Sequence, residues 1–186
     1  MIFSVNILKK HSMFNNLNKI KNLILRKCMS SIRYARFLGV EVGNDCTIQI
    51  KNWGTEPYLI SIGNNVGITQ GVRFHTHGGS RVLKEEHPGF ATFGKIRVND
   101  YVFIGTGAQI MPGVTIGKGS LVSAGSIVTK SVPEKVVVGG NPARIICTIE
   151  EFKERNLKYN LGCRRLNLTE KKLFLLSLPD DKFISK

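Results

Sequence analysis

Residues 98–128 read VNDYVFIGTGAQIMPGVTIGKGSLVSAGSIV, and a β-branched aliphatic residue returns at every sixth position of this stretch. This column contains Val98, Ile104, Ile110, Ile116, Val122 and Val128, and the same step appears upstream at Val42, Ile48, Ile62, Ile68 and Phe74. An amphipathic helix repeats every 3.6 residues and a half-buried strand repeats every two, so neither produces a step of six. The step predicts short strands that recur at a fixed interval and point side chains into a shared interior.

Two further columns accompany the aliphatic one. Small or medium residues stand two places before the next aliphatic position, at Cys46, Val66, Val72, Val102, Ala108, Val114, Ser120 and Ser126. Residues that tolerate a positive φ stand one place earlier, at Asp45, Asn65, Gly71, Gly107, Gly113, Gly119 and Gly125, and Tyr101 and Ser131 break this run. Tight corners between short strands stacked about 4.8 Å apart produce all three columns, so the sequence predicts a parallel β-helix.

The repeat is interrupted twice. The stretch NWGTEP at residues 52–57 shifts its phase, and GGSRVLKEEHPGFATFGK at residues 78–95 forms an insertion directly after His75-Thr76-His77. A long loop in a tightly repetitive domain is more often functional than decorative. Trp53 and Tyr101 could each line a cleft or serve as packing residues.

The two ends of the chain differ in kind from the repeat. Residues 13–38 space their apolar side chains helically, and residues 149–159 and 168–178 predict two short helices, the second capped by Thr169 and ended by Pro179. We therefore expect three regions: a basic helical arm at 1–37, a β-helix at 38–147 with a loop at 78–95, and a helical extension at 148–186.

Charge and composition restrict the setting. The formal net charge is +14, and residues 1–40 carry eight Lys and Arg but no acidic residue. A basic arm of this kind predicts an anionic partner, for example peripheral contact with a membrane surface, or a solvated face. No apolar run reaches about 18 residues, the beginning lacks a leader pattern, and the four cysteines are scattered, which favours a cytoplasmic protein with reduced thiols.

The stretch VNDYVFIGTGAQIMPGVTIGKGSLVSAGSIVTKSVPEKVVVGGNPARII, residues 98–146, resembles the hexapeptide-repeat acyltransferases. Within them it is similar to the maltose/galactoside and polysaccharide O-acetyltransferase branch, over roughly residues 38–150. The resemblance implies an all-β core, a left-handed parallel β-helix of hexapeptide repeats, flanked here by helical ends. It also implies a homotrimer that binds acetyl-CoA in clefts between neighbouring subunits.

The resemblance also implies roles for individual residues. The catalytic histidine precedes the loop, and Thr76-His77-Gly78-Gly79 matches the polysaccharide branch, so His77 is favoured over His75. The Thr106 backbone N–H corresponds to the oxyanion donor. The predicted acetyl-CoA contacts are Thr106, Ala124, Thr129, Lys130 and Arg144. Independently of the resemblance, Lys130 and Arg144 suit the phosphates of that cofactor because they are cations.

Acetyl transfer to a hydroxyl needs a base for the acceptor proton and donors for the developing oxyanion. A neutral histidine supplies the base, so we expect direct transfer from acetyl-CoA to a sugar or surface-polysaccharide precursor. Cys46 falls on an inward column and no G-x-S-x-G elbow is present, which argues against an acyl-enzyme. Four carboxylates are candidates to orient the imidazole: Asp45, Glu85, Glu86 and Asp100.

Two other functions remain open from the sequence. A zinc-dependent hydratase similar to the gamma-type carbonic anhydrases could use His75, His77 and His87, although we expect no metal. A non-catalytic β-helix scaffold would keep the repeat for assembly alone. Nucleic-acid binding is not expected, because the basic arm lacks interleaved aromatic residues and no known module is present.

Overall fold

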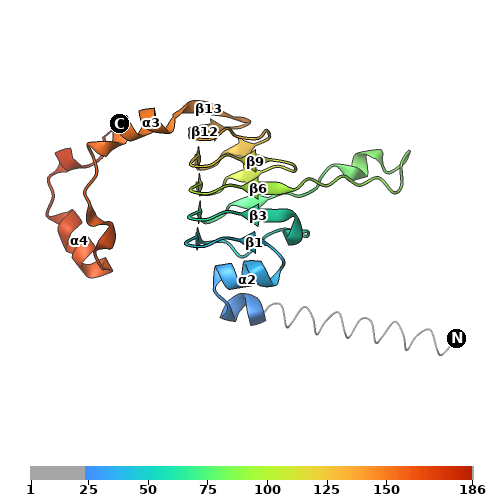
Figure 1. The fold of residues 1–186 in the computed structure, drawn as a ribbon, viewed down its shortest axis with the longest axis horizontal. Helices are drawn as coiled ribbons and strands as arrows, with labels where there is room; N and C mark the ends of the chain where they lie inside the picture. Colours follow the sequence, from blue (N-terminus) through green and yellow to red (C-terminus); the bar gives the residue numbers. More distant parts are fainter. Residues whose placement is uncertain (1–23, 186) are drawn as a thin grey trace.

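The computed structural model describes residues 24–185. Its short parallel strands stack into a three-sided prism, with helical segments at both ends (Figure 1). Phe103 pairs with Leu121, and Gln109 pairs with Ile127, so each regular coil uses three hexapeptides. Sheet A contains β1 (Glu41–Val42), β3 (Ile60–Ile62), β6 (Ile96–Val98) and β9 (Thr115–Ile116). Sheet B contains β2 (Thr47–Ile48), β4 (Gly67–Ile68), β7 (Phe103–Ile104), β10 (Leu121–Val122), β12 (Val136–Gly140) and β13 (Ala143–Thr148). Sheet C contains β5 (Arg73–Phe74), β8 (Gln109–Ile110) and β11 (Ile127–Val128).

The aliphatic column fills the interior of the prism, as the six-residue step predicts. Val98, Ile104, Ile110, Ile116, Val122 and Val128 are all at most 2% exposed and belong to one core cluster. β-branched side chains suit this position because they pack well on a pleated surface. The parallel β-helix prediction is confirmed.

The corners lie where the third column predicts them. Asp45 and Asn65 have φ of 55°, and the corner glycines have φ of 68–80°. Tyr101, which was expected to break the run, keeps the same corner with a φ of 58°, and its N–H donates to the carbonyl of Asn64 in the coil below. Ser131 has no positive φ. Lys135, with a φ of 54°, holds the next corner along the chain, which is equivalent to those of Tyr101 and Gly119, and its N–H donates to the Lys118 carbonyl.

One end of the prism is closed by helix α2 (Ser31–Phe37), with Ser30 as its N-cap. Tyr34 and Ala35 are buried, and Ala35 belongs to the prism core. Residues 24–28 are also helical, and the helical spacing at 13–38 is interrupted at Met29 and Ser30. The rest of the predicted arm, residues 1–23, lies outside the described residues. The anionic partner expected from it therefore stays a prediction.

The other end is closed by the antiparallel pair β12–β13, from which the C-terminal extension leaves the prism (Figure 1). The extension contains α3 (Ile149–Leu157), η3 (Cys163–Arg165), α4 (Leu168–Leu176) and η4 (Asp180–Lys182). The two helices were predicted, but the Thr169 cap is wrong. Asn167 caps α4 instead, because its side chain accepts from Glu170 N–H while Glu170 accepts from Asn167 N–H. Neither helix buries a residue.

The two interruptions of the repeat have different outcomes. Trp53, in the first, is buried and stacks on Phe74 at a centroid distance of 5.3 Å, so it packs the core. The same segment continues into η1 (Pro57–Leu59). The second, green in Figure 1, projects sideways from the prism and contains η2 (Ser80–Leu83). No helix within residues 24–185 is both long and apolar enough to span a bilayer.

Candidate active site

His77 stands where the chain leaves the prism. Phe74 is the last inward residue of β5, and the six-residue repeat predicts a corner three residues later, at His77. No corner forms there. His77 instead pairs with Phe93 in an antiparallel bridge, and Gly94 N–H donates to the Thr76 carbonyl. The two strands of the loop base therefore hold His77 on the edge between sheets C and A, called the C/A edge below.

The carboxylate partner of His77 is Glu56, which was not among the four candidates. Its Oε2 lies 2.7 Å from His77 Nδ1 and also accepts from the Thr76 hydroxyl. Asp100, one of the four, accepts from Asn64 N–H instead. Glu56 belongs to the phase-shifting stretch at 52–57. In the first coil, register partners are twenty residues apart, as in Glu41 and Ser61, which places Glu56 beneath Thr76.

This contact determines what the imidazole can do. The Thr76 hydroxyl, followed by the His77 ring, keeps the pKa of Glu56 below its usual value. An ionised carboxylate only accepts hydrogen bonds, so the neutral imidazole donates from Nδ1 and keeps its lone pair on Nε2. Among the described residues Nε2 contacts no hydrogen-bond partner, and the side chain is 45% exposed. The geometry is that of an oriented general base.

The face of the His77 ring is also fixed. Phe93, from the far end of the loop, lies with its ring centroid 5.7 Å from that of His77 at an angle of 57°. Phe93 was not predicted, and only the pairing of the loop base brings it to the histidine. A carboxylate below and an aromatic ring beside the imidazole together restrict its rotation.

His75, the alternative base, is held differently. Its Nε2 lies 3.0 Å from Gln109 Oε1 on the outer surface of sheet C, and the side chain is half-buried. His87 lies in the projecting loop, at the turn before Pro88. In the described part of the chain, no three His, Cys, Asp or Glu side chains are grouped closely enough to hold a metal ion.

Two of the predicted cofactor residues lie on a second edge, between sheets B and C, called the B/C edge below. Thr106 and Ala124 occupy equivalent corners of successive coils, and Gly125 N–H donates to the Thr106 carbonyl. The coils approach so closely that a Cβ at Gly105 would lie 2.5 Å from the Ala124 nitrogen. Within residues 24–185 the Thr106 N–H has no protein acceptor, so it is available as a donor.

The remaining predicted residues are divided between other positions. Thr129 and Lys130 follow β11 and are exposed on the C/A edge, above His77. Arg144 is exposed on β13. One copy of the chain therefore places His77 and Lys130 on one edge of sheet C and Thr106 and Ala124 on the other. The topology does not bring His77 and Thr106 together.

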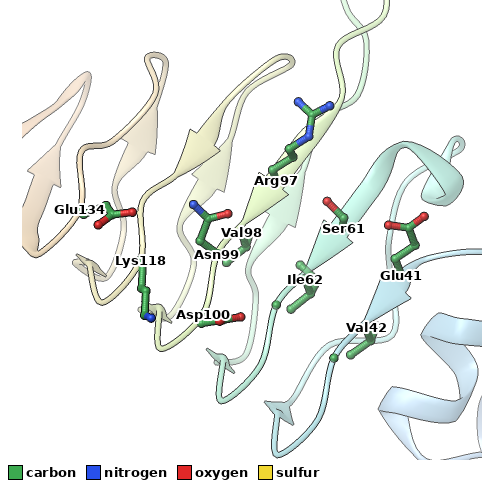
Figure 2. Close-up of a pocket in the computed structure, with 12 residues that line it drawn as sticks. Glu41, Val42, Ser61, Ile62, Arg97, Val98, Asn99, Asp100, Lys118 and Glu134 are labelled. Atoms are coloured by element: carbon green, nitrogen blue, oxygen red, sulfur yellow. The ribbon is translucent and has the colours of Figure 1, made fainter.

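A groove on sheet A holds none of these residues. Its volume is about 510 Å³, and its polar side chains come from neighbouring coils (Figure 2). Figure 2 shows Arg97, Ser61 and Glu41 pointing outward from successive strands, with Lys118 and Asp100 at the corner. Its lining combines the carboxylates of Glu41, Asp100 and Glu134 with Arg97 and Lys118, and none of its described residues is a histidine or a cysteine.

Comparisons with known proteins agree with this geometry. Residues 95–130 match the bacterial transferase hexapeptide model of six repeats. Protein CapG of Staphylococcus aureus is 47% identical over 146 residues, which cover 76% of this chain and 85% of that protein. The chain belongs to the hexapeptide-repeat acyltransferases. Membership confirms the predicted family and enzyme class and implies that the prism is left-handed.

Two further relatives identify related chemistry. Galactoside O-acetyltransferase of Escherichia coli is 36% identical over 104 residues, which cover 56% of this chain and 50% of that enzyme. The hexapeptide-repeat acetyltransferase VCA0836 of Vibrio cholerae was solved with acetyl-CoA. It superimposes with a TM-score of 0.52 at 28% identity, covering 68% of this chain and 82% of that one. The predicted acetyl donor is the one that this relative binds.

Proposed function

We propose that this acyltransferase transfers an acetyl group from acetyl-CoA to a hydroxyl of a sugar or polysaccharide precursor, with His77 as the general base. The contact between Glu56 and His77 Nδ1 carries the proposal, because in the neutral imidazole it holds the proton on Nδ1 and leaves the lone pair of Nε2 open to solvent. The sugar acceptor is supported by the likeness to galactoside O-acetyltransferase and by the polysaccharide-branch pattern around His77.

The proposed reaction is a direct transfer. His77 Nε2 takes the proton of the acceptor hydroxyl as its oxygen bonds to the thioester carbonyl carbon. The Thr106 N–H donates to the oxyanion that forms. The carbon–sulfur bond then breaks, the proton passes from His77 to the CoA sulfur, and the acetyl ester leaves with free CoA. Lys130 and Arg144 are proposed to contact the cofactor phosphates.

The site requires two copies of the chain. His77 and Thr106 lie on opposite edges of sheet C, so a reacting carbonyl can meet both only where the C/A edge of one copy faces the B/C edge of the next. A closed ring of three prisms, with sheet C toward the axis, creates three such clefts. A homotrimer with acetyl-CoA in the clefts is therefore part of the proposal.

The assignment of His77 is tested with purified His77→Ala and His77→Asn. Acetyl-CoA is incubated with free hexoses, N-acetylhexosamines and nucleotide sugars, and released thiol and acetylated product are both measured. We expect a loss of about 10²–10⁴-fold in kcat for both variants on the best acceptor. His87→Ala is the matched control, because it removes a histidine of the same loop. Full activity of His77→Ala would overturn the assignment.

His75→Ala separates the two candidate histidines. If His75 only packs against Gln109, its loss changes kcat by less than tenfold. A loss equal to that of His77→Ala, with the fold intact by circular dichroism, would mean that His75 shares the catalytic role.

A further inference from the structure

Tyr101 holds a corner at which its ring has one close neighbour, the Lys118 Nζ at 6.0 Å from the ring centroid. The equivalent corner is held in other coils by Asp45, Asn65 and Gly119, which accept a positive φ at little cost, and by Lys135 in the last coil. For a bulky side chain this conformation costs about 1–2 kcal/mol. Tyr101 nevertheless has a φ of 58° and is 61% exposed, so its ring gains little from the core. The hydrogen bonds of the neighbouring coils hold this backbone corner, and the exposed ring is left available to a ligand.

A second exposed aromatic residue lies beside it. Phe103 points outward from sheet B and is 45% exposed. Its ring lies over Gly67 of the coil below, where a Cβ would come within 2.9 Å of it. The absence of a side chain at Gly67 therefore lets the ring lie against the sheet and present its other face to solvent.

These two rings line a groove on sheet B with a volume of about 470 Å³. Its floor includes Thr47 and Gly67, one side is formed by the corner residues Asp45 and Asn65, and the other by Gln49 and Thr69. Arg164 of η3 contributes from the C-terminal extension. The lining therefore combines exposed aromatic rings with several uncharged hydrogen-bonding groups.

The composition of the groove identifies the class of ligand. It contains one acidic and one basic side chain, Asp45 and Arg164, which is too few cations for a polyphosphate or nucleic acid. Amide and hydroxyl groups pair with neutral hydroxyls, and an aromatic face packs against the apolar C–H face of a sugar ring. We propose that this groove binds an oligosaccharide segment of the acceptor, with Tyr101 and Phe103 as the stacking residues.

The position of the groove relates it to the active site. Thr69, on its far side, lies 3.3 Å from the Thr106 hydroxyl at the B/C edge. A glycan chain bound across sheet B therefore leads toward the edge that, under the proposed function, faces His77 of the neighbouring copy. This inference rests on that function for its orientation, and on the groove alone for its ligand class.

The test uses substitutions that copy equivalent positions of other coils. Tyr101→Asn reproduces the corner at Asn65, and Phe103→Thr reproduces Thr47 of β2, so both are compatible with the fold. Phe183→Ser removes an exposed aromatic residue of the C-terminal extension and is the control. Binding of maltohexaose, chitohexaose and hexagalacturonate to the full chain is measured by calorimetry, alongside kcat and KM for monosaccharide and hexasaccharide acceptors.

We expect at least one hexasaccharide to bind, with its Kd raised tenfold or more by Tyr101→Asn and by Phe103→Thr but unchanged by Phe183→Ser. Monosaccharide turnover should stay within twofold of wild type in all three. The assignment of the groove as a glycan site would be wrong if none of the three hexasaccharides binds, or if neither variant changes the binding. Loss of the oligomer in Tyr101→Asn by sedimentation would also overturn it, since the face would then be a subunit interface.

The two proposals fail in different ways. If hexasaccharides bind but no sugar accepts an acetyl group, the proposed function is wrong and the groove stands. If monosaccharides are acetylated and no hexasaccharide binds, the groove is wrong and the proposed function stands.

Discussion

The regular coils at residues 98–128 differ from the interruptions at residues 52–57 and 78–95 in what they contribute to the prism. In the regular coils the aliphatic side chain at every sixth position is buried, and successive coils keep one register. In the interruptions the chain leaves the repeat, and there Glu56, His77 and Phe93 come into contact. The repeat supplies a fixed spacing and the corners at Thr106 and Ala124, while the departures from it bring Glu56 and Phe93 to His77.

The largest expected effect comes from mixing two inactive variants, one with a defective C/A edge and the other with a defective B/C edge. His77→Ala and Ala124→Arg should each be nearly inactive, the first for lack of a base and the second because its side chain fills the B/C edge. If sites form between copies, a 1:1 mixture of the two, unfolded and refolded together, regains about a quarter of wild-type activity. Activity of refolded mixtures is compared with that of each variant refolded alone, and no recovery would place the whole site within one copy.

The regular part is expected to respond in stability instead. Ile110 is fully buried in the middle of sheet C, and Ile110→Ala leaves a cavity among close-packed neighbours. We expect a loss of about 2–5 kcal/mol in the free energy of unfolding, measured by urea denaturation. The activity of the fraction that remains folded should be close to wild type. Gln109→Ala, the adjacent outward residue, serves as the comparison, and equal destabilisation by both would contradict the assignment of the core.

Glu56→Gln tests the interruption without removing the base. The amide keeps the shape but loses the charge, so the imidazole is less firmly oriented and the imidazolium less stabilised. A hydrogen bond to a charged group is worth about 1.5–3 kcal/mol, which corresponds to about 10–100-fold in rate. We expect a loss of that size in kcat, with KM for acetyl-CoA unchanged.

The pH dependence gives a further readout of the same variant. Because Thr76 and His77 lower the pKa of Glu56 in the folded protein, the stability that its charge contributes is present above the unfolded-state pKa and is lost as pH falls through the lowered one. In wild type, the free energy of unfolding should therefore fall as the pH is lowered through this range. Glu56→Gln should be less stable than wild type at neutral pH, and the difference should shrink as the pH falls, which urea denaturation at several pH values measures. A difference that does not change with pH would show that the charge of Glu56 contributes no stability.

The smallest expected effect belongs to Tyr101→Asn. Replacing the strained tyrosine with the residue of the coil below should leave the free energy of unfolding unchanged or raise it by up to about 1 kcal/mol. Thermal unfolding measures this, with Tyr58→Asn, an exposed aromatic outside these corners, as the control. A marked loss of stability would show that the Tyr101 ring supports the fold.

Particular residues show how far the sequence could lead. The column from Val98 to Val128 predicts the prism, because few backbone conformations can bury a side chain at every sixth position. The pattern around His77 predicts it as the base, but no pattern predicts its carboxylate partner. No motif around Glu56 marks it as a functional residue. Glu56 lies beneath Thr76 because the first and second coils pair residues that are twenty positions apart, whereas the regular coils pair residues eighteen positions apart.

The corner at Tyr101 shows the converse. Residue type predicted a break, yet the hydrogen bonds of the coils below and above hold the corner in place. Backbone pairing along the whole edge outweighs the preference of one side chain.

The sequence by itself determined how the chain winds and which family it belongs to, because the buried aliphatic residue recurs at a short, fixed interval over many coils. Only the tertiary structure decided which carboxylate meets His77, and that His77 and Thr106 lie on opposite edges of sheet C. Those contacts join residues that are distant in the chain, and their geometry depends on how each irregular segment alters the register between coils.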